Sequence, residues 1–244
     1  MVRKSELRAK VKEKILLIGD TGVGKTYTCV KIAGFVAGHG KKVVYIDTER
    51  GAGRELEALP DEVLENITYV DAPEWDAMQR AVFRNDSCFL KILDGISEVF
   101  VASKFWLEDR FIAKGKYQVG ESEIEITDRE VFTLPWQSYS KVYDFVRKTV
   151  HELVKQSPHI LVTMHPFGDT ETKRSLEADV FRKFDTILEL RRTTKQTPPS
   201  IVYDAVLRKH RGRPFEAFYA MTNYIDKLKK LFARRMGVEV NDRD

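Results

Sequence analysis

The stretch KILLIGDTGVGKTYTCVKIAGFVAGHG, residues 14–40, joins two different hydrophobic patterns through a glycine-rich turn. Residues 14–19 are a short apolar run typical of a buried strand, and residues 24–40 have the length and closing glycine of a helix. Between them, residues 19–26 match G-x-x-x-x-G-K-[ST] at every fixed position. A strand before this motif and a helix after it are the context that a phosphate-binding loop requires. The alternative is a glycine-rich turn that matches by chance.

The residue types of this loop predict its chemistry. Its glycines let successive backbone N–H groups point inward, and the positive end of the helix dipole faces the same space. Lys25 is expected to reach the β- and γ-phosphates, and the Thr26 hydroxyl to be a ligand of Mg²⁺. We therefore expect the chain to bind ATP together with Mg²⁺. The expected nucleotide-binding residues are Gly19, Asp20, Thr21, Gly22, Val23, Gly24, Lys25, Thr26 and Tyr27.

Strand-like apolar runs alternate with helical stretches along the rest of the chain. This alternation predicts an α/β fold with a mostly parallel sheet covered by helices on both faces. The last two strands lie close together around a glycine-containing turn, which predicts an antiparallel hairpin at the C-terminal end of the sheet. The expected strands are residues 14–19, 42–47, 67–71, 88–94, 159–165, 184–191, 200–210 and 214–221, and two further helices are expected at 73–84 and 136–156.

Residues 1–244 are expected to form a single domain with three additions to its core. These are a basic N-terminal arm at 1–13, an insertion at 105–134 and a basic C-terminal helix at 222–236. The insertion mixes aromatic and charged residues and breaks the alternation of strands and helices. A connection of this length is usually functional. It is interpreted as a small hairpin or lid, with plain packing against the sheet edge as the alternative.

Four carboxylates lie at or just after the ends of predicted strands and compete for roles beside the phosphates. Asp94 ends the apolar run FLKILD and is the preferred second ligand on the Mg²⁺ side, directly or through water. Asp71 also ends a strand, but the Ala-Pro and helix after it suit a helix N-cap better. Asp47 and Glu49, in the sequence IDTERG, are either solvated turn residues or part of an active site.

Four features, in order along the chain, resemble the RecA-like ATPases, which include the RecA and RadA recombinases, the KaiC family and replicative helicases of the DnaB type. They are the loop at 19–26, VVYIDTERG at 43–51, the strand ending at Asp94, and ILVTMH at 160–165. The resemblance implies a RecA-like P-loop core. It also implies that Glu49 polarises the attacking water, with Asp47 as a supporting carboxylate.

Residues 138–192 look closer still to the phage- or virus-type RecA-like ATPases linked to single-strand annealing and recombination. That resemblance makes His165 the sensor of the γ-phosphate; a satisfied histidine at a strand end is the alternative. VLRKHRGRP at 206–214 resembles the basic strand-end motif of RecA-like hexamers. It implies that Lys209 and Arg211 act on a neighbouring subunit's γ-phosphate, and the alternative is a solvated hairpin tip.

The net charge is modest, +4 from 41 Lys and Arg against 37 Asp and Glu, but its basic residues form clusters. Such clusters fit binding to a polyanion, or only solubility. No run of 18 apolar residues occurs, so no membrane partner is expected. Cys29 and Cys88 lie far apart in apolar contexts and suit reduced residues in a cytoplasmic protein.

The function expected from these features is Mg²⁺-dependent ATP hydrolysis by a homo-oligomer that acts on single- or double-stranded DNA. Recombination or annealing, helicase and packaging roles all belong to this class. The alternative is a KaiC-like regulatory ATPase that acts on protein partners without DNA. A small-molecule kinase is a third class, which the basic pair and the Asp-Thr-Glu sequence fit poorly.

Overall fold

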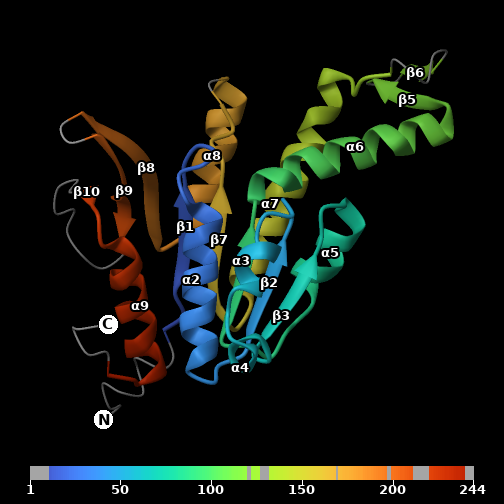
Figure 1. The fold of residues 1–244 in the computed structure, drawn as a ribbon. Coiled ribbons are helices and arrows are strands. Elements are labelled where there is room, and N and C mark those ends of the chain that lie inside the picture. The colour runs from blue at the N-terminus through green and yellow to red at the C-terminus, as the bar shows by residue number, and fades with distance from the viewer. Residues whose placement is uncertain are drawn as a thin grey trace, which may run out of the picture.

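A computed structural model describes residues 11–119, 122–126, 132–168, 170–196, 199–210 and 220–239. Its centre is a sheet with the strand order β10-β9-β8-β1-β7-β4-β2-β3 (Figure 1). The strands are β1 (Lys14–Ile18), β2 (Val43–Asp47), β3 (Ile67–Asp71), β4 (Leu90–Asp94), β7 (His159–Met164), β8 (Thr186–Gln196), β9 (Pro199–His210) and β10 (Ala220–Met221). The sheet runs parallel from β8 to β3, which confirms the predicted α/β class.

The antiparallel part of the sheet is larger than the sequence indicated. β10 pairs antiparallel with β9, as expected for the last two strands, although the turn at 211–219 lies outside the described residues. In addition, β8 continues to Gln196 and forms a long antiparallel hairpin with β9. The predicted strand at 184–191 was therefore too short. Its outer half is polar, so hydrophobicity gave no signal there, and cross-strand pairing maintains it instead.

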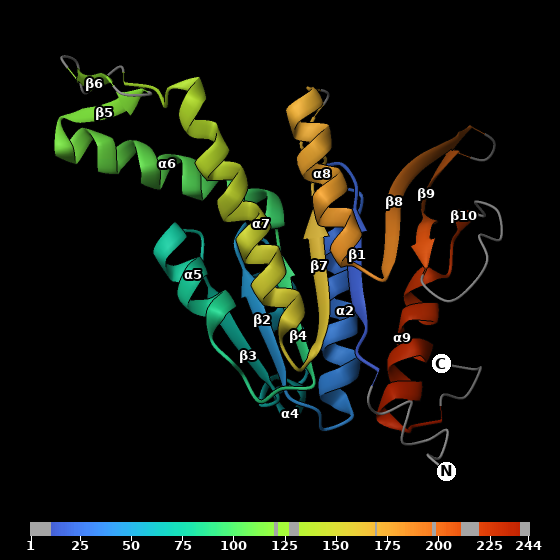
Figure 2. The ribbon, with the colours of Figure 1, turned by 180° about the vertical axis from the view of Figure 1, so that it is seen from behind.

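Helices cover both faces of the sheet. α2 (Lys25–Gly38), α3 (Gly53–Glu57), α4 (Asp61–Leu64) and α9 (Tyr224–Met236) lie on one face; α5 (Trp75–Phe83), α6 (Ile96–Lys114), α7 (Tyr139–Lys155) and α8 (Glu171–Lys183) lie on the other (Figures 1 and 2). Side chains of β1 alternate between them: Ile15 and Leu17 pack with α2 and α9, whereas Leu16 and Ile18 pack with α5 to α8. Burial on both faces explains why the central strands are continuous apolar runs.

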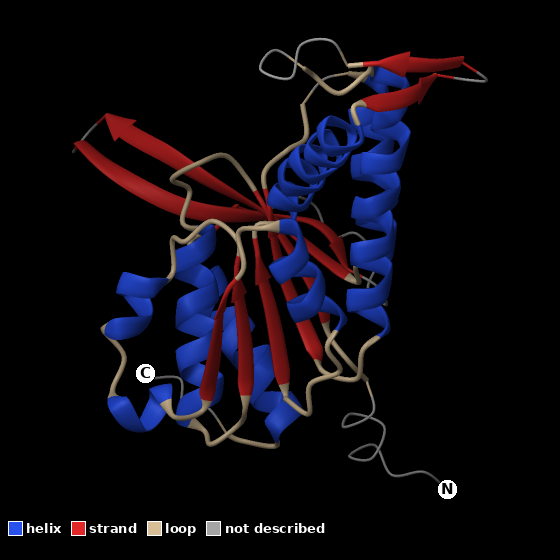
Figure 3. Cartoon of the chain, turned by 90° about the vertical axis from the view of Figure 1, so that its right-hand side faces the viewer, coloured by secondary structure: helices blue, strands red, loops and turns tan. Residues whose placement is uncertain are grey.

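The region expected as an insertion, 105–134, is divided between a helix and a hairpin. α6 continues without a break from Ile96 to Lys114 and ends at Gly115 in the left-handed conformation, at φ 71°. A two-stranded hairpin of β5 (Lys116–Val119) and β6 (Ser122–Glu125) follows, and it lies beyond the edge of the main sheet (Figure 3). No break in secondary structure marks residue 105, because the aromatic residues there lie on a helix that packs against α7. A 3₁₀ turn, η1 (Trp136–Ser138), leads into α7.

The structure describes the C-terminal helix but little of the N-terminal arm. α9 occupies Tyr224–Met236, inside the predicted basic helix at 222–236, and buries Leu228 and Phe232. The basic arm at 1–13 falls mostly outside the described residues. Within the described ranges, the helices all lack the combination of length and apolar composition that a membrane span needs.

Candidate active site

The phosphate loop connects the end of β1 to the first residue of α2, as the motif predicts. Gly24, the residue before α2, has φ 91°, a left-handed conformation that costs an L side chain about 1–2 kcal/mol. Gly19 is required for a different reason: a Cβ there would lie 2.6 Å from the Leu190 carbonyl oxygen of β8. The loop therefore passes directly against β8, and α2 points its N-terminus at the space above the loop.

Lys25 is buried at the centre of this site. Its Nζ donates to the carbonyl oxygens of Gly19, at 2.8 Å, and Asp20, at 2.9 Å, and it lies 3.3 Å from Nδ1 of His165. Burial lowers the pKa of Lys25, while the negative charges of Glu49 and Asp94 act in the opposite direction. The ammonium is therefore held by the loop itself, in the position from which it could turn to a bound phosphate.

Asp94 is the buried carboxylate beside the loop. At the end of β4, it accepts hydrogen bonds from Tyr45, at 2.7 Å, from Thr163, at 2.6 Å, and from the Thr26 hydroxyl. Burial raises its pKa, and these three hydroxyl donors partly offset that effect. The pairing of Thr26 with Asp94 brings together the two predicted Mg²⁺-side residues. A hydroxyl and one carboxylate next to a phosphate loop suit Mg²⁺, which keeps several water ligands and binds few protein groups.

The other strand-end carboxylate, Asp71, is placed away from this pair. It is half-exposed on β3 and forms an ion pair with Arg50, with Nε and Oδ1 3.2 Å apart. Arg50 itself has φ 57°, in the left-handed region. The structure thus brings Asp94, and not Asp71, to Thr26. Asp71 and Arg50 fasten the turn after β2 to the neighbouring strand.

Asp47 organises the turn that carries Glu49. Its fully buried carboxylate accepts from the backbone N–H groups of Glu49, at 3.1 Å, and Ala52, at 2.9 Å, and from the Tyr69 hydroxyl at 3.0 Å. These contacts supply partners that a tight turn at a strand end would otherwise lack. Asp47 therefore supports the turn, and Glu49 is left to project from it.

Glu49 and His165 face each other across the site. His165 Nε2 lies 3.5 Å from Glu49 Oε1, while Nδ1 faces the Lys25 ammonium. Because an ammonium only donates, Nδ1 is the acceptor and a neutral His165 carries its proton on Nε2, toward Glu49. Burial and the charge of Asp94 raise the pKa of Glu49; His165 and Lys25 oppose this. Lys25, His165 and Glu49 thus form one connected row.

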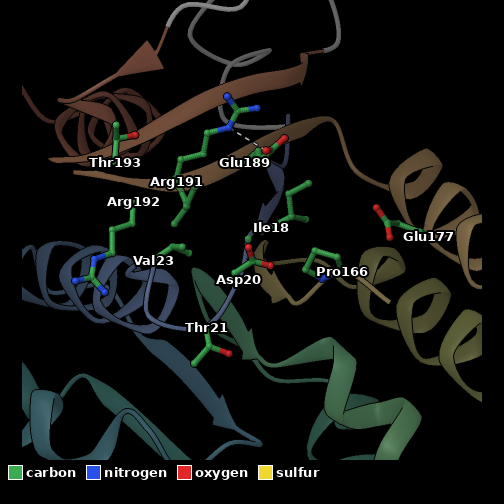
Figure 4. Close-up of a pocket in the computed structure, with 12 residues that line it drawn as sticks. Ile18, Asp20, Thr21, Val23, Pro166, Glu177, Glu189, Arg191, Arg192 and Thr193 are labelled. Carbon is green, nitrogen blue, oxygen red and sulfur yellow. Dashed lines mark hydrogen bonds and ion pairs between the residues drawn. The ribbon is translucent and has the colours of Figure 1, made fainter. Parts of the chain in front are cut away.

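A cavity of about 640 Å³ opens on the other side of the loop, between residues 18–23 and β8 (Figure 4). Pro166 and Glu177 line it from the β7 side, and Arg191 and Arg192 line it from β8. Arg191 is engaged with Glu189 at 2.9 Å. Figure 4 shows Arg191 and Arg192 pointing in opposite directions from β8. The cavity gives the loop an accessible flank lined by both charged and apolar side chains.

Of the predicted basic pair, Lys209 is described by the structure, and it is not part of this arrangement within one chain. Lys209, on β9, donates its Nζ to the Phe181 carbonyl oxygen of α8 at 2.9 Å. Arg211 lies outside the described residues. The structure therefore places Lys209 on the α8 side of the hairpin and leaves the proposed action on a neighbouring subunit as a proposal.

Four contributors to the site were missed from the sequence: Tyr45, Thr163, Gly95 and Ser97. Tyr45 and Thr163 hold Asp94, and the Ser97 hydroxyl accepts from the His165 backbone N–H at 2.8 Å. Only Gly95 had an available signal, a glycine directly after the strand-end Asp94. The other three act across strands, so their roles depend on the strand order.

Comparison with solved structures identifies the architecture. The structure is similar to a KaiC-like protein from the hyperthermophilic archaeon Pyrococcus horikoshii OT3, with a TM-score of 0.51 and 16% sequence identity over 84% of this chain and 83% of that one. The fold is RecA-like. The flagellar accessory protein FlaH from Methanocaldococcus jannaschii has a TM-score of 0.49 at 13% identity over the same two shares. No protein-family model and no curated protein matches the sequence. At 16% identity, the similarity shows the fold alone.

Proposed function

We propose that the chain is a Mg²⁺-dependent ATPase. The observation that carries this proposal is the convergence of Lys25, the Thr26–Asp94 pair and the Glu49–His165 pair at the carboxyl edge of one parallel sheet. Each comes from a different strand or loop, and together they supply a phosphate contact, a metal-side carboxylate and a base. Ligands of open α/β sheets bind at this edge.

In the proposed reaction, water attacks the γ-phosphorus of ATP and the bond to the β,γ-bridging oxygen breaks. Glu49 orients the water and accepts its proton; its raised pKa makes it a better base than an exposed glutamate. Lys25 turns from the loop carbonyls to the β- and γ-phosphates and stabilises their charge. Mg²⁺, held by Thr26 and Asp94, would neutralise charge on the phosphate oxygens. The products are ADP and phosphate.

The decisive experiment compares Glu49→Gln with the wild type. The variant is expected to bind ATP normally and to lose turnover by about 10²–10⁴-fold, the usual contribution of a positioned base. Binding is measured by calorimetry and turnover by phosphate release. Glu57→Gln, on the exposed side of the next helix, is the matched control and should hydrolyse ATP at the wild-type rate. Normal turnover in Glu49→Gln would remove Glu49 from the mechanism.

We further propose that the active form is a homo-oligomer in which Lys209 and Arg211 contact the γ-phosphate of a neighbouring subunit. Lys209 would exchange its Phe181 contact for that phosphate. Arg211→Ala should then be inactive alone but recover turnover when mixed with Lys25→Ala, because each subunit supplies what the other lacks. Absence of recovery under conditions where differently tagged subunits co-purify as mixed oligomers would argue against a role in trans.

DNA is the proposed partner of this oligomer, in keeping with the resemblance to annealing and recombination ATPases and with the basic clusters. Binding of a labelled single strand, and its effect on ATP turnover, should be measured from about 50 to 200 mM salt. Phosphate contacts predict an affinity that falls steeply over this range. If no binding occurs even at the lowest salt, the regulatory ATPase that acts on protein partners becomes the better description.

A further inference from the structure

The backbone of His165 lies just beyond the hydrogen-bonding of the sheet. β7 ends at Met164, which is the last residue of that strand in register with β1, opposite Ile18. The backbone N–H and carbonyl groups of His165 are instead hydrogen-bonded to one side chain of α6. The Ser97 hydroxyl accepts the His165 N–H at 2.8 Å and donates to the His165 carbonyl oxygen at 3.0 Å. Both backbone groups of His165 are thus held by a single oxygen atom.

Ser97 lies where the end of β4 passes directly into α6, close to the other residues of the site. It lies in the first turn of α6, three residues after Asp94, and Gly95 starts this helix directly from the end of β4. The Gly95 N–H in turn donates to the Thr163 hydroxyl at 2.7 Å. The N-terminal end of α6 is therefore hydrogen-bonded at two residues of the β7 segment, Thr163 and His165.

We infer that Ser97 is a positioning residue for His165, an inference that rests on the proposed ATPase function. The His165 ring fits between Lys25 Nζ, at 3.3 Å, and Glu49 Oε1, at 3.5 Å, so a shift of its backbone changes both distances. A displacement of about 1 Å in such a constellation can cost up to about 100-fold in rate. The Ser97 hydroxyl is engaged with the His165 backbone, so Ser97 acts through His165 and not on the nucleotide.

The test is a double-mutant cycle on ATP turnover with Ser97→Ala and His165→Ala. Ser97→Ala is expected to lower kcat by between about 10-fold and 100-fold, with KM for ATP changed less than about 2-fold. In the His165→Ala background, the same change should have no further effect, because the residue to be positioned is gone. Equal effects in both backgrounds, or wild-type kcat in Ser97→Ala, would overturn the inference.

Two further variants separate positioning from folding. Ser103→Ala removes a serine hydroxyl from the same helix. Among the described residues, that hydroxyl donates to the Phe100 carbonyl oxygen of the same helix, at 3.2 Å, so this variant should keep wild-type kcat. Ser97→Thr retains the hydroxyl and should recover most of the activity. If Ser97→Ala does not fold, Ser97→Cys replaces it, since the thiol keeps the size but is a weak donor and acceptor.

A spectroscopic measurement does not depend on turnover. The imidazole nitrogen signals of His165 should move in Ser97→Ala and stay unchanged in Ser103→Ala; no movement in Ser97→Ala would overturn the inference. Failure of the ATPase proposal looks different, since the wild type itself would then release no phosphate. If His165→Ala alone turns over like the wild type, the proposed role of His165 fails, and the nitrogen signals still decide whether Ser97 holds it.

Discussion

Gly95 is the residue where the backbone at the end of β4 meets the side chain of Glu49. It has φ 104°, and a Cβ built there would lie 2.4 Å from Thr48 Oγ1 and 2.8 Å from Glu49 Oε1. An alanine must therefore adopt an unfavourable conformation and displace the proposed base. Gly95→Ala is expected to lose at least about 1–2 kcal/mol of unfolding free energy and most of its ATP turnover.

The control for Gly95→Ala is Gly237→Ala, at the end of α9. Gly237 has φ 73°, and a Cβ added to it would meet no described atom within 4 Å. It should show the backbone cost alone in urea unfolding and retain full turnover. Wild-type turnover in Gly95→Ala would show that Glu49 tolerates displacement.

His159 predicts a pH dependence of stability. It is buried at the start of β7, with its Nδ1 accepting from the Glu13 N–H at 2.9 Å and its ring against Phe89. Burial, followed by the charges of Lys12 and Arg235, lowers its pKa to about 4. Since the unfolded value is about 6.5, the unfolded chain binds the proton more tightly. Stability is therefore complete above about pH 6.5 and is lost as the pH falls toward 4.

Between pH 7.5 and 5.0, this single group should remove roughly 2 kcal/mol of unfolding free energy. Urea midpoints of the wild type and His159→Gln at both pH values measure it. Glutamine retains an acceptor for the Glu13 N–H but does not titrate, so its loss over this range should be smaller by that amount. An equal loss in both proteins would assign the pH dependence to other groups.

Sequence motifs predicted the residues whose chemical type and place in a motif indicate a role. They missed the residues whose role depends on which strands and helices the fold brings together. The loop placed Lys25 and Thr26, and the strand end placed Asp94. Nothing in the spacing indicates that Tyr45 and Thr163 converge on Asp94, because that depends on β4 lying between β2 and β7. The same holds for Ser97, which is 68 residues from His165 along the chain.

Among the elements, α9 provides a test of how the phosphate-loop helix is supported. Phe232 is fully buried between α9 and the sheet, and the Tyr224 hydroxyl lies 3.1 Å from Thr28 Oγ1 of α2. Phe232→Ala is expected to cost about 3–5 kcal/mol in urea unfolding. Phe105→Ala, at a phenylalanine that is 56% exposed on α6, should cost far less. Similar costs would mean that α9 adds little to the core.

Hydrophobic periodicity predicted the elements that are buried and failed for those that are not. The central strands and α2 follow from continuous apolar runs and were found within a few residues of their observed limits. The outer half of the β8–β9 hairpin and the second half of α6 carry mixed side chains, so pairing and helix propensity determine them instead. A pattern that reports burial cannot detect elements that extend into solvent.

At the scale of the whole molecule, nucleotide binding should appear as global stability. The proposed phosphate contacts join β1, α2, β4 and β7, which exist only in the folded chain. At 100 times its Kd, Mg²⁺–ATP should stabilise the wild type by about 2.7 kcal/mol. This corresponds to roughly 5–11 °C in thermal midpoint for a chain of this size.

Lys25→Ala provides the control for this linkage, because it removes the ammonium at the centre of the loop. Its thermal midpoint should rise by much less on adding the same Mg²⁺–ATP. Equal shifts in the two proteins would mean that the nucleotide binds elsewhere than at the loop.

The parallel strand arrangement was predictable from the alternation of strands and helices, whereas the order of the strands was not.

α6 is long enough to connect the end of β4 to a hairpin outside the main sheet. Ser97, in the first turn of α6, lies three residues after Asp94 and holds the backbone of His165. The C-terminal end of α6 carries the β5–β6 hairpin beyond the sheet (Figure 3). At 1.5 Å per residue, the helix spans roughly 28 Å. The helix therefore joins the β5–β6 hairpin directly to the edge of the sheet where Lys25, Glu49 and His165 lie.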